Sequence, residues 1–268
     1  MKKIVIIFSI LASYVVFTQA QINTSDLLNQ GLLDTNDEKK KKDRSTQKTV
    51  LSQFHAGVNF PLDNFAGGHE LNDVFGEGKG FAAIGFTVGY KLYSQIGVEN
   101  LSFVFCLDAF YNGFNSDGKD FFDEPEEYAN VDITYPKYLN FPATIGLNYA
   151  IPASETVKIY GEGGIGANLS TISKASLSGS DFDGYKFYEE VKFTPKVGFI
   201  FALEGGVFIN QKVSIGLRYN NFGSYKYKYK YEGKEGDREW RLYQYKGKDI
   251  LNKSLPISNI SLRVGIMF

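Results

Sequence analysis

ISNISLRVGIMF, residues 257–268, alternates apolar residues with polar or small ones over almost its whole length. Successive side chains of a β-strand point to opposite faces, so the alternation predicts a strand with one apolar and one polar face. The apolar positions are Ile260, Leu262, Val264, Ile266 and Phe268. The other face carries Asn259, Ser261, Arg263 and Gly265. The fold must therefore give the strand face that carries Arg263 a polar environment.

Seven earlier segments repeat this pattern, so the sequence predicts eight strands. Several are longer than the roughly 9 to 11 residues with which a tilted strand crosses a bilayer. Their second faces carry glycines and isolated charges, which suit a narrow polar lumen. The segments are 54–60, 80–92, 101–111, 138–149, 157–169, 193–209 and 213–220.

The connections between these segments alternate between long and short. Long ones are 61–79, 113–134, 171–190 and 223–255; short ones are 93–100, 150–156 and 210–212. Barrels of bacterial outer membranes have short turns at one end and long loops at the other. A soluble sandwich or lipocalin-like barrel would bury its apolar face, which here is too large and aromatic for a small interior. We therefore predict an all-β fold, an eight-stranded antiparallel transmembrane β-barrel over residues 50–268.

The first 49 residues have a different character. Residues 1–20 combine a basic start, an apolar run and small residues before a cleavage point, which predicts a secretory signal peptide. A retained membrane anchor is the alternative. Residues 21–49 are dense in charge and predict a flexible polar segment. The only cysteine is Cys106, so no internal disulfide is expected.

Two stretches resemble outer-membrane proteins. Phe268, Ile266 and Val264 resemble the C-terminal signal that the barrel insertion machinery recognises. Residues 137–149 resemble a strand of the small outer-membrane barrel family that includes PorT-like and porin-like proteins, through Tyr138, Leu139, Phe141 and Pro142. The resemblance implies an outer-membrane location, contact with membrane lipids and lipopolysaccharide, and no defined chemistry.

Charged residues on the second face predict a network inside the barrel. Its predicted acids are Asp108, Glu162 and Glu204; its predicted bases are Lys91, Lys158, Lys196, Arg218 and Arg263. If residues 210–212 form the turn, Glu204 faces Arg218 across the hairpin. A gated ion path is one interpretation. We favour a structural plug, because an eight-stranded barrel is just wide enough for its own side chains.

No motif for catalysis, cofactor or metal binding stands out. GEGGIG, residues 161–166, matches a dinucleotide fingerprint but lacks the helix that must follow. The two histidines are His55, expected to point into the lumen, and His69, in the first long loop. No G-x-S-x-G sequence is present to suggest an esterase. We predict that the protein is not an enzyme and has no cofactor.

SYKYKYKYEGKEG, residues 224–236, interleaves tyrosines with lysines. The parity of the preceding strand places its tyrosines outward and Lys226, Lys228 and Lys230 inward, on a strand that continues beyond the bilayer. Residues 238–248 are expected to complete a hairpin. The lysines are candidate contacts for an acidic partner. The net charge of the chain, −1, argues against a nucleic-acid-binding protein.

Three functions remain open from sequence. The first is a structural, adhesive or partner-binding protein that works through long extracellular loops, with an extracellular or envelope protein among the possible partners. The second is a narrow porin or channel for small or apolar solutes. The third is a component of secretion or envelope assembly.

Overall fold

The computed structural model describes residues 50–67, 80–115, 128–181, 186–236, 242–250 and 254–268. The predicted signal peptide, the polar segment 21–49 and His69 lie outside these ranges. None of the helices in the described ranges is long and apolar enough to cross a bilayer.

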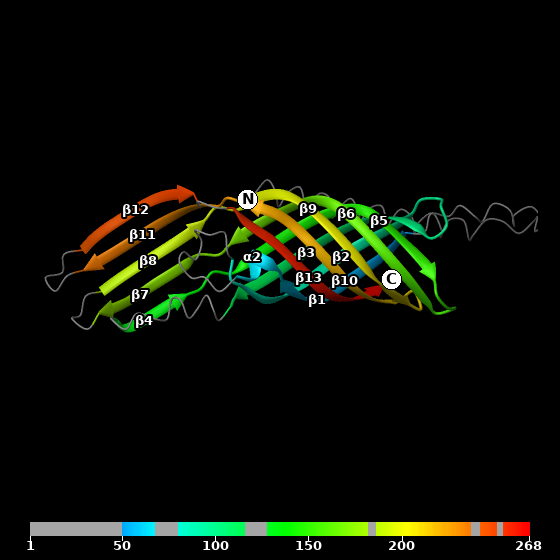
Figure 1. The fold of residues 1–268 in the computed structure, drawn as a ribbon, viewed down its shortest axis with the longest axis horizontal. Helices are drawn as coiled ribbons and strands as arrows, with labels where there is room; N and C mark the ends of the chain where they lie inside the picture. The colour runs from blue at the N-terminus through cyan, green and yellow to red at the C-terminus, as the bar shows by residue number, and fades with distance from the viewer. Residues whose placement is uncertain (1–49, 68–79, 116–127, 182–185, 237–241, 251–253) are drawn as a thin grey trace, which may run out of the picture. The chain divides into compact units, whose positions relative to one another are not determined.

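Eight antiparallel strands form a closed barrel, as the sequence predicts (Figure 1). Around the barrel they follow the order β1-β13-β10-β9-β6-β5-β3-β2, so the first and last strands close it. Their bounds are β1 (Val50–Pro61), β2 (Ala82–Gln95), β3 (Leu101–Phe114), β5 (Tyr138–Pro152), β6 (Val157–Ile172), β9 (Lys196–Ile209), β10 (Val213–Tyr225) and β13 (Leu255–Met267).

The barrel is apolar outside and polar inside. Outward side chains such as Ile84, Val197 and Ile266 are 63–65% exposed, whereas inward Lys91 and Arg218 are at most 2% exposed. A soluble barrel would have the opposite distribution, because exposing that many large apolar groups to water is unfavourable. The protein is therefore a transmembrane β-barrel.

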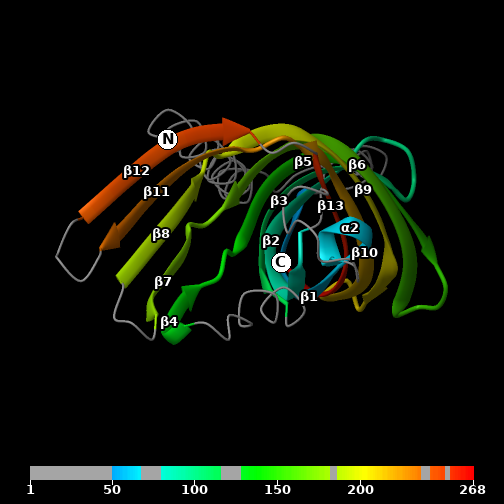
Figure 2. The ribbon, with the colours of Figure 1, turned by 60° about the vertical axis from the view of Figure 1, so that its left-hand side comes forward.

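The structure has a second sheet of five strands, of which the sequence predicts only the last hairpin. Its order is β12-β11-β8-β7-β4 (Figures 1 and 2). The bounds are β4 (Tyr128–Thr134), β7 (Ala175–Asp181), β8 (Lys186–Phe193), β11 (Lys228–Gly236) and β12 (Leu242–Ile250). Linkers of two or three residues join β4, β7, β8 and β11 to barrel strands. The sheet therefore continues from the barrel end that carries the long connections.

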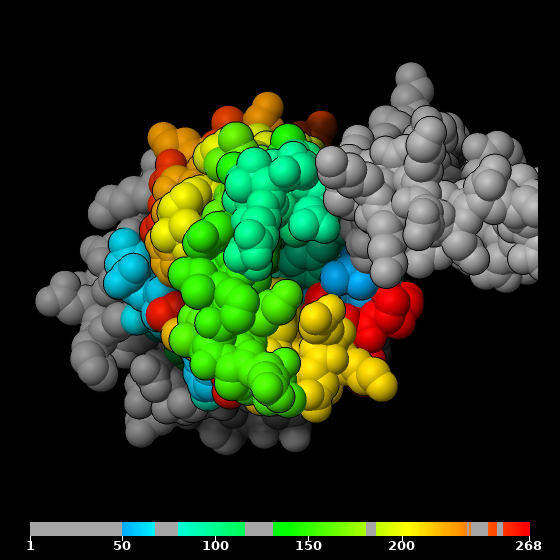
Figure 3. Space-filling view, turned by 90° about the vertical axis from the view of Figure 1, so that its right-hand side faces the viewer, coloured from blue at the N-terminus to red at the C-terminus, as the bar shows by residue number. Residues whose placement is uncertain are grey.

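The two ends of the lumen are filled by separate apolar clusters. At the long-connection end, the one-turn helix α2 (Asp63–Ala66) inserts Phe65, which packs edge-on against Tyr138 with ring centroids 5.1 Å apart. At the other end, where the short turns meet (Figure 3), Tyr160 stacks on Phe208 with centroids 4.2 Å apart. Polar side chains fill the space between.

The tyrosine-lysine stretch is oriented opposite to the prediction. Gly223 adopts a φ of +82°, and the pairing of β10 with β13 shifts register between Asn221 and Ser224. Phe222 and then Tyr225 therefore both point inward, at 0% and 5% exposure. This shift by one residue exchanges the inward and outward positions of the chain beyond Gly223. As a result Tyr227 is also buried, whereas Lys226, Lys228 and Lys230 are exposed rather than inward-facing.

Candidate functional site

Four charged side chains meet inside the barrel. The Lys91 ammonium Nζ lies 2.8 Å from Glu204 Oε2 and 3.0 Å from Glu162 Oε2. Arg218 NH1 lies 2.8 Å from Glu162 Oε1 and 3.2 Å from Glu204 Oε2. All four side chains are at most 4% exposed. Each carboxylate is thus shared by two cations, an arrangement that offsets the high cost of burying charge.

A second group adjoins the first. His55 Nε2 lies 2.6 Å from Asp108 Oδ1, and Arg263 NH2 lies 3.2 Å from Asp108 Oδ2. Arg263 NH1 is 3.8 Å from Glu204 Oε2, which connects the two groups. We call the seven residues of both groups the lumen cluster: His55, Lys91, Asp108, Glu162, Glu204, Arg218 and Arg263. With neutral histidine, its three bases balance its three acids.

Glycines on the barrel wall make room for these long side chains. Gly89 lies between His55 on β1 and Asp108 on β3, as the Cα partner of both. A Cβ at Gly89 would collide with the Asp108 carboxylate and the His55 ring. Gly216 leaves the same kind of space beside the hydrogen bond of 2.7 Å from Tyr160 to Glu204. The inward glycines therefore decide where the charged groups can meet.

Most of the predicted network is brought together. The register that places Glu204 opposite Arg218 is confirmed. His55 and Lys91 point inward as expected. Lys158 and Lys196 are the exceptions: each is half-buried near the first residue of its strand, β6 or β9, and forms none of the ion pairs of the cluster. Lys196 lies eight residues before Glu204, about 27 Å away along the strand. The contact of Lys91 with Glu204 across the lumen could not be predicted from strand registers, because β2 and β9 are not neighbours.

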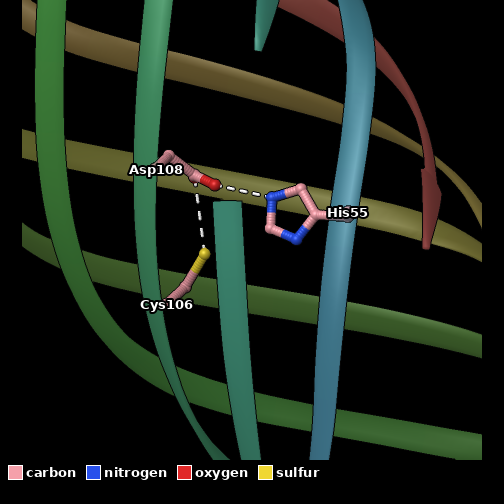
Figure 4. Close-up of side chains that lie close together, drawn as sticks. All are labelled: His55, Cys106 and Asp108. Atoms are coloured by element: carbon pink, nitrogen blue, oxygen red, sulfur yellow. Dashed lines mark hydrogen bonds and ion pairs between the residues drawn. The ribbon is translucent and has the colours of Figure 1, made fainter. Parts of the chain in front are cut away.

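His55, Cys106 and Asp108 offer ligand atoms within 4.8 Å of one another (Figure 4). Metal binding there is disfavoured by Arg263, whose NH1 is 3.1 Å from His55 Nε2 and which also contacts Asp108. Cys106 is not paired with the histidine as in a cysteine–histidine catalytic pair: its Sγ donates to Asp108 Oδ2 over 3.4 Å, and that carboxylate is already held by Arg263. The geometry supports an ion-pair network.

A layer of asparagines separates the lumen cluster from the apolar cluster at the long-connection end. Its members are each at most 1% exposed and bond in pairs across the strands. Asn112 donates to Asn59 over 2.6 Å, Asn168 to Asn140 over 2.9 Å, and Asn220 to Asn259 over 2.9 Å. Among the described residues, the lumen is thus filled by apolar, amide and charged layers in turn.

The five-stranded sheet has two unlike faces. One face, which we call the lysine face, carries Lys174, Lys186, Lys192, Lys228, Lys230, Lys234, Lys246 and Lys248, with Asp132, Glu190 and Glu232. The opposite face is mainly apolar and aromatic, with Val131, Ile133, Leu177, Phe187, Val191, Tyr229 and Tyr231, and also carries Glu189 and Asp249. The lysine face therefore has five more bases than acids.

Lysines line up across the strands of this face. Lys192, Lys230 and Lys248 are direct partners on β8, β11 and β12. Glu190 accepts a bond of 3.0 Å from Lys174 and a shorter one from Lys192. These two ammonium groups, Lys192 first, lower the pKa of the Glu190 carboxyl to about 2. A single carboxylate is thus shared between two lysines at the edge of the row.

Comparison with known proteins gives a likeness of fold. No protein-family model and no curated protein matches the chain. Among solved structures, Neisserial surface protein A is 14% identical, covering 81% of this chain and 95% of its own, with a TM-score of 0.41. A major outer membrane protein of Thermus thermophilus is 8% identical, covering 82% and 99%, with a TM-score of 0.46. The attachment invasion locus protein of Yersinia pestis, Ail, is 14% identical, covering 82% and 99%, with a TM-score of 0.35. At such values the likeness says nothing about what this chain binds.

Proposed function

We propose that this chain is an outer-membrane protein whose barrel is a filled anchor and whose lysine face binds phosphate-bearing saccharides of lipopolysaccharide. The observation that carries the proposal is the row formed by Lys192, Lys230 and Lys248. Like charges placed directly opposite each other destabilise a sheet. A bound anion would remove that cost.

The spacing of the lysine face suits several phosphates at once. Neighbouring strands lie about 4.8 Å apart, and side chains on one face recur about every 6.8 Å along a strand. Lysine side chains are flexible point charges that suit phosphate groups in varied positions. The sheet also continues from the barrel end that carries the long connections, which in outer-membrane barrels is the cell-surface end. Phosphorylated sugars of the outer leaflet would lie within its reach.

Water-soluble, deacylated lipopolysaccharide oligosaccharide tests this proposal without involving the bilayer. The detergent-solubilised protein should bind it by titration calorimetry, more weakly as salt rises, because screening weakens contacts between exposed charges. The triple variant Lys192→Gln, Lys230→Gln, Lys248→Gln should bind at least tenfold more weakly, from about 1 kcal/mol for each lysine near an anionic surface. Lys158→Gln with Lys212→Gln, which removes two lysines at the other barrel end, is the control.

Enzymatic removal of the phosphates separates charge recognition from sugar recognition. Binding that is unchanged for the dephosphorylated oligosaccharide would contradict the proposal. So would an equal loss in the triple variant and in the control.

A channel is the second candidate, and one observation bears on it. A cavity of about 390 Å³ opens at the short-turn end, lined by Leu51, Lys158 and Met267 among others. Tyr93, Tyr160 and Phe208 pack together inward of it. The cavity therefore resembles a vestibule closed by side chains, which favours the anchor over the channel.

A further inference from the structure

The barrel wall is interrupted along the seam between β9 and β10. The ladder of these strands ends at the pair Phe201 and Asn221. It resumes further along, where the Thr194 amide donates to the Lys228 carbonyl over 2.8 Å. Between these points, residues 195–200 and 222–227 do not pair with each other. We call this interruption the window.

The window arises because each of the two strands exchanges its inward and outward positions at one point, and the two points do not lie opposite each other. On the β10 side, Phe222 and Tyr225 both point inward across Gly223, whose φ is +82°. On the β9 side the reversal comes at Thr194 and Pro195, because Phe193 packs on the interior cluster while the outward residue Val197 is 65% exposed. Directly opposite residues of an antiparallel pair must share a face. Between the two reversals they do not, so the ladder cannot form.

Tyrosines close the window from inside. Tyr225 passes behind β9, and its hydroxyl lies 3.1 Å from Asn168 Nδ2 on β6. Tyr227 bonds to Ser170 on the same strand over 2.6 Å. Gly198 is required by this arrangement, because a Cβ there would lie 2.6 Å from the Tyr225 ring. The window is therefore a recess with a floor, separate from the lumen.

The recess has an apolar outer part and a basic edge. Its volume is about 420 Å³, and its lining includes Val197, Phe199 and Phe201, which are 37–65% exposed. The exposed Lys226 follows Tyr225, a lining residue, at the end of the recess that is further from Phe201. Lys196 pairs with the buried Ser170 on β6 and therefore faces inward, away from the recess. Backbone edges without a partner strand are unfavourable against lipid tails, so a transmembrane barrel requires something to cover them.

We propose that the window binds one anionic phospholipid, with an acyl chain along Phe199 and Phe201 and the phosphate at Lys226. Phosphate and ester oxygens can accept from the exposed edge amides, and head-group hydroxyls can donate to the edge carbonyls. A recess of this volume lies within the usual range for small-molecule sites, about 300 to 1,000 Å³. This site shares no residue with the lysine face and does not depend on its function.

Fluorescence quenching by a brominated lipid tests the site in a bilayer. Trp240→Phe removes the single native tryptophan, and Phe199→Trp then reports on the window. Ile159→Trp, at a lipid-facing position that is 56% exposed in the native protein, reports on bulk lipid. The protein is reconstituted in phosphatidylcholine containing a small fraction of dibrominated phosphatidylglycerol. Quenching at position 199 should exceed quenching at position 159.

Removal of this lysine should reduce the excess. Lys226→Gln should weaken phosphatidylglycerol binding about fivefold, while leaving quenching at position 159 unchanged. Lys196→Gln, on the inner face of β9, is the matched control and should retain the excess. The lysine-face triple variant should retain the excess quenching. Equal quenching at both positions, or an excess that is undiminished in Lys226→Gln or appears equally with brominated phosphatidylcholine, would overturn the proposal.

Discussion

Lys91 on β2 reaches across the lumen to Glu204 on β9, with 2.8 Å between Nζ and Oε2. The two residues are 113 positions apart, and their strands are not neighbours in the barrel. Glu204 also accepts from Tyr160 over 2.7 Å and from Arg218 over 3.2 Å. One carboxylate therefore connects opposite sides of the wall, which makes it the centre of the lumen cluster.

Glu204→Gln should destabilise the folded barrel by about 3 to 5 kcal/mol, the usual cost of leaving a buried charge without its partner. Lys91 and Arg218 would keep only Glu162 as a shared carboxylate. Urea unfolding in lipid vesicles, followed by heat-modifiable gel mobility, would measure the loss. Glu155→Gln, the same change in an exposed turn, should leave the midpoint unchanged; a shift as large there would refute the assignment.

Exchange of Glu204 and Arg218 gives a sharper test of the network. The hairpin register alone suggests that Glu204→Arg with Arg218→Glu would restore stability. The structure leads us to expect no recovery, since an arginine at position 204 would face Lys91 and lie near Arg263. Recovery to within about 1 kcal/mol of wild type would show that the pair acts alone and that the wider network contributes little.

Zinc should not stabilise the wild-type protein, although His55, Cys106 and Asp108 lie close together. His55 Nε2 lies 2.6 Å from the Asp108 carboxylate, so a zinc ion between the two would have to replace their hydrogen bond. Arg263 places a positive charge against the same two groups. Thermal unfolding with and without micromolar zinc would measure this. A rise in the midpoint that disappears in His55→Ala would contradict it.

The alternation of side chains predicted the barrel correctly because each strand meets two different environments. Lipid outside and a polar interior impose period two on every strand, and the turn at 210–212 then fixes which residues of one hairpin face each other. Contacts such as that of Lys91 with Glu204 do not follow from neighbouring registers. They depend on barrel closure and on the glycines that leave room inside.

The failed prediction for the tyrosines has a local cause. The alternation of tyrosine and lysine continues without a break through residues 225–231, so the pattern carries no sign of a reversal. Gly223 was the available signal, because its left-handed φ lets the strand shift by one residue. The lysine face was missed for another reason: β4, β7 and β8 are short and lie within connections read as loops.

Acid should loosen the second sheet near Glu190. The neighbouring lysines lower the pKa of this carboxyl to about 2 in the folded protein, from an unfolded value near 4.5. A lowered folded pKa means that the contribution to stability is complete above about pH 4.5 and is lost as the pH falls towards 2. Hydrogen exchange of β7 and β8 amides should therefore accelerate between pH 5 and pH 2.5, after correction for intrinsic rates. Glu190→Gln should lack this additional dependence, and an identical profile in both proteins would exclude Glu190 as the cause.

Planar bilayers containing the refolded barrel should show no steady single-channel current. The lumen cluster and the asparagine layer occupy the polar interior, and aromatic side chains close both ends. An eight-stranded barrel has no width to spare once such side chains are in place. Arg218→Ala with Glu162→Ala removes one cation and one anion at contact distance, 2.8 Å, and so keeps the net charge while emptying part of the interior. If that variant also remains silent while still folded, the aromatic ends are sufficient barriers. Steady, salt-dependent currents through the wild-type protein would show instead that the layers open, and the channel would then replace the anchor as the leading function.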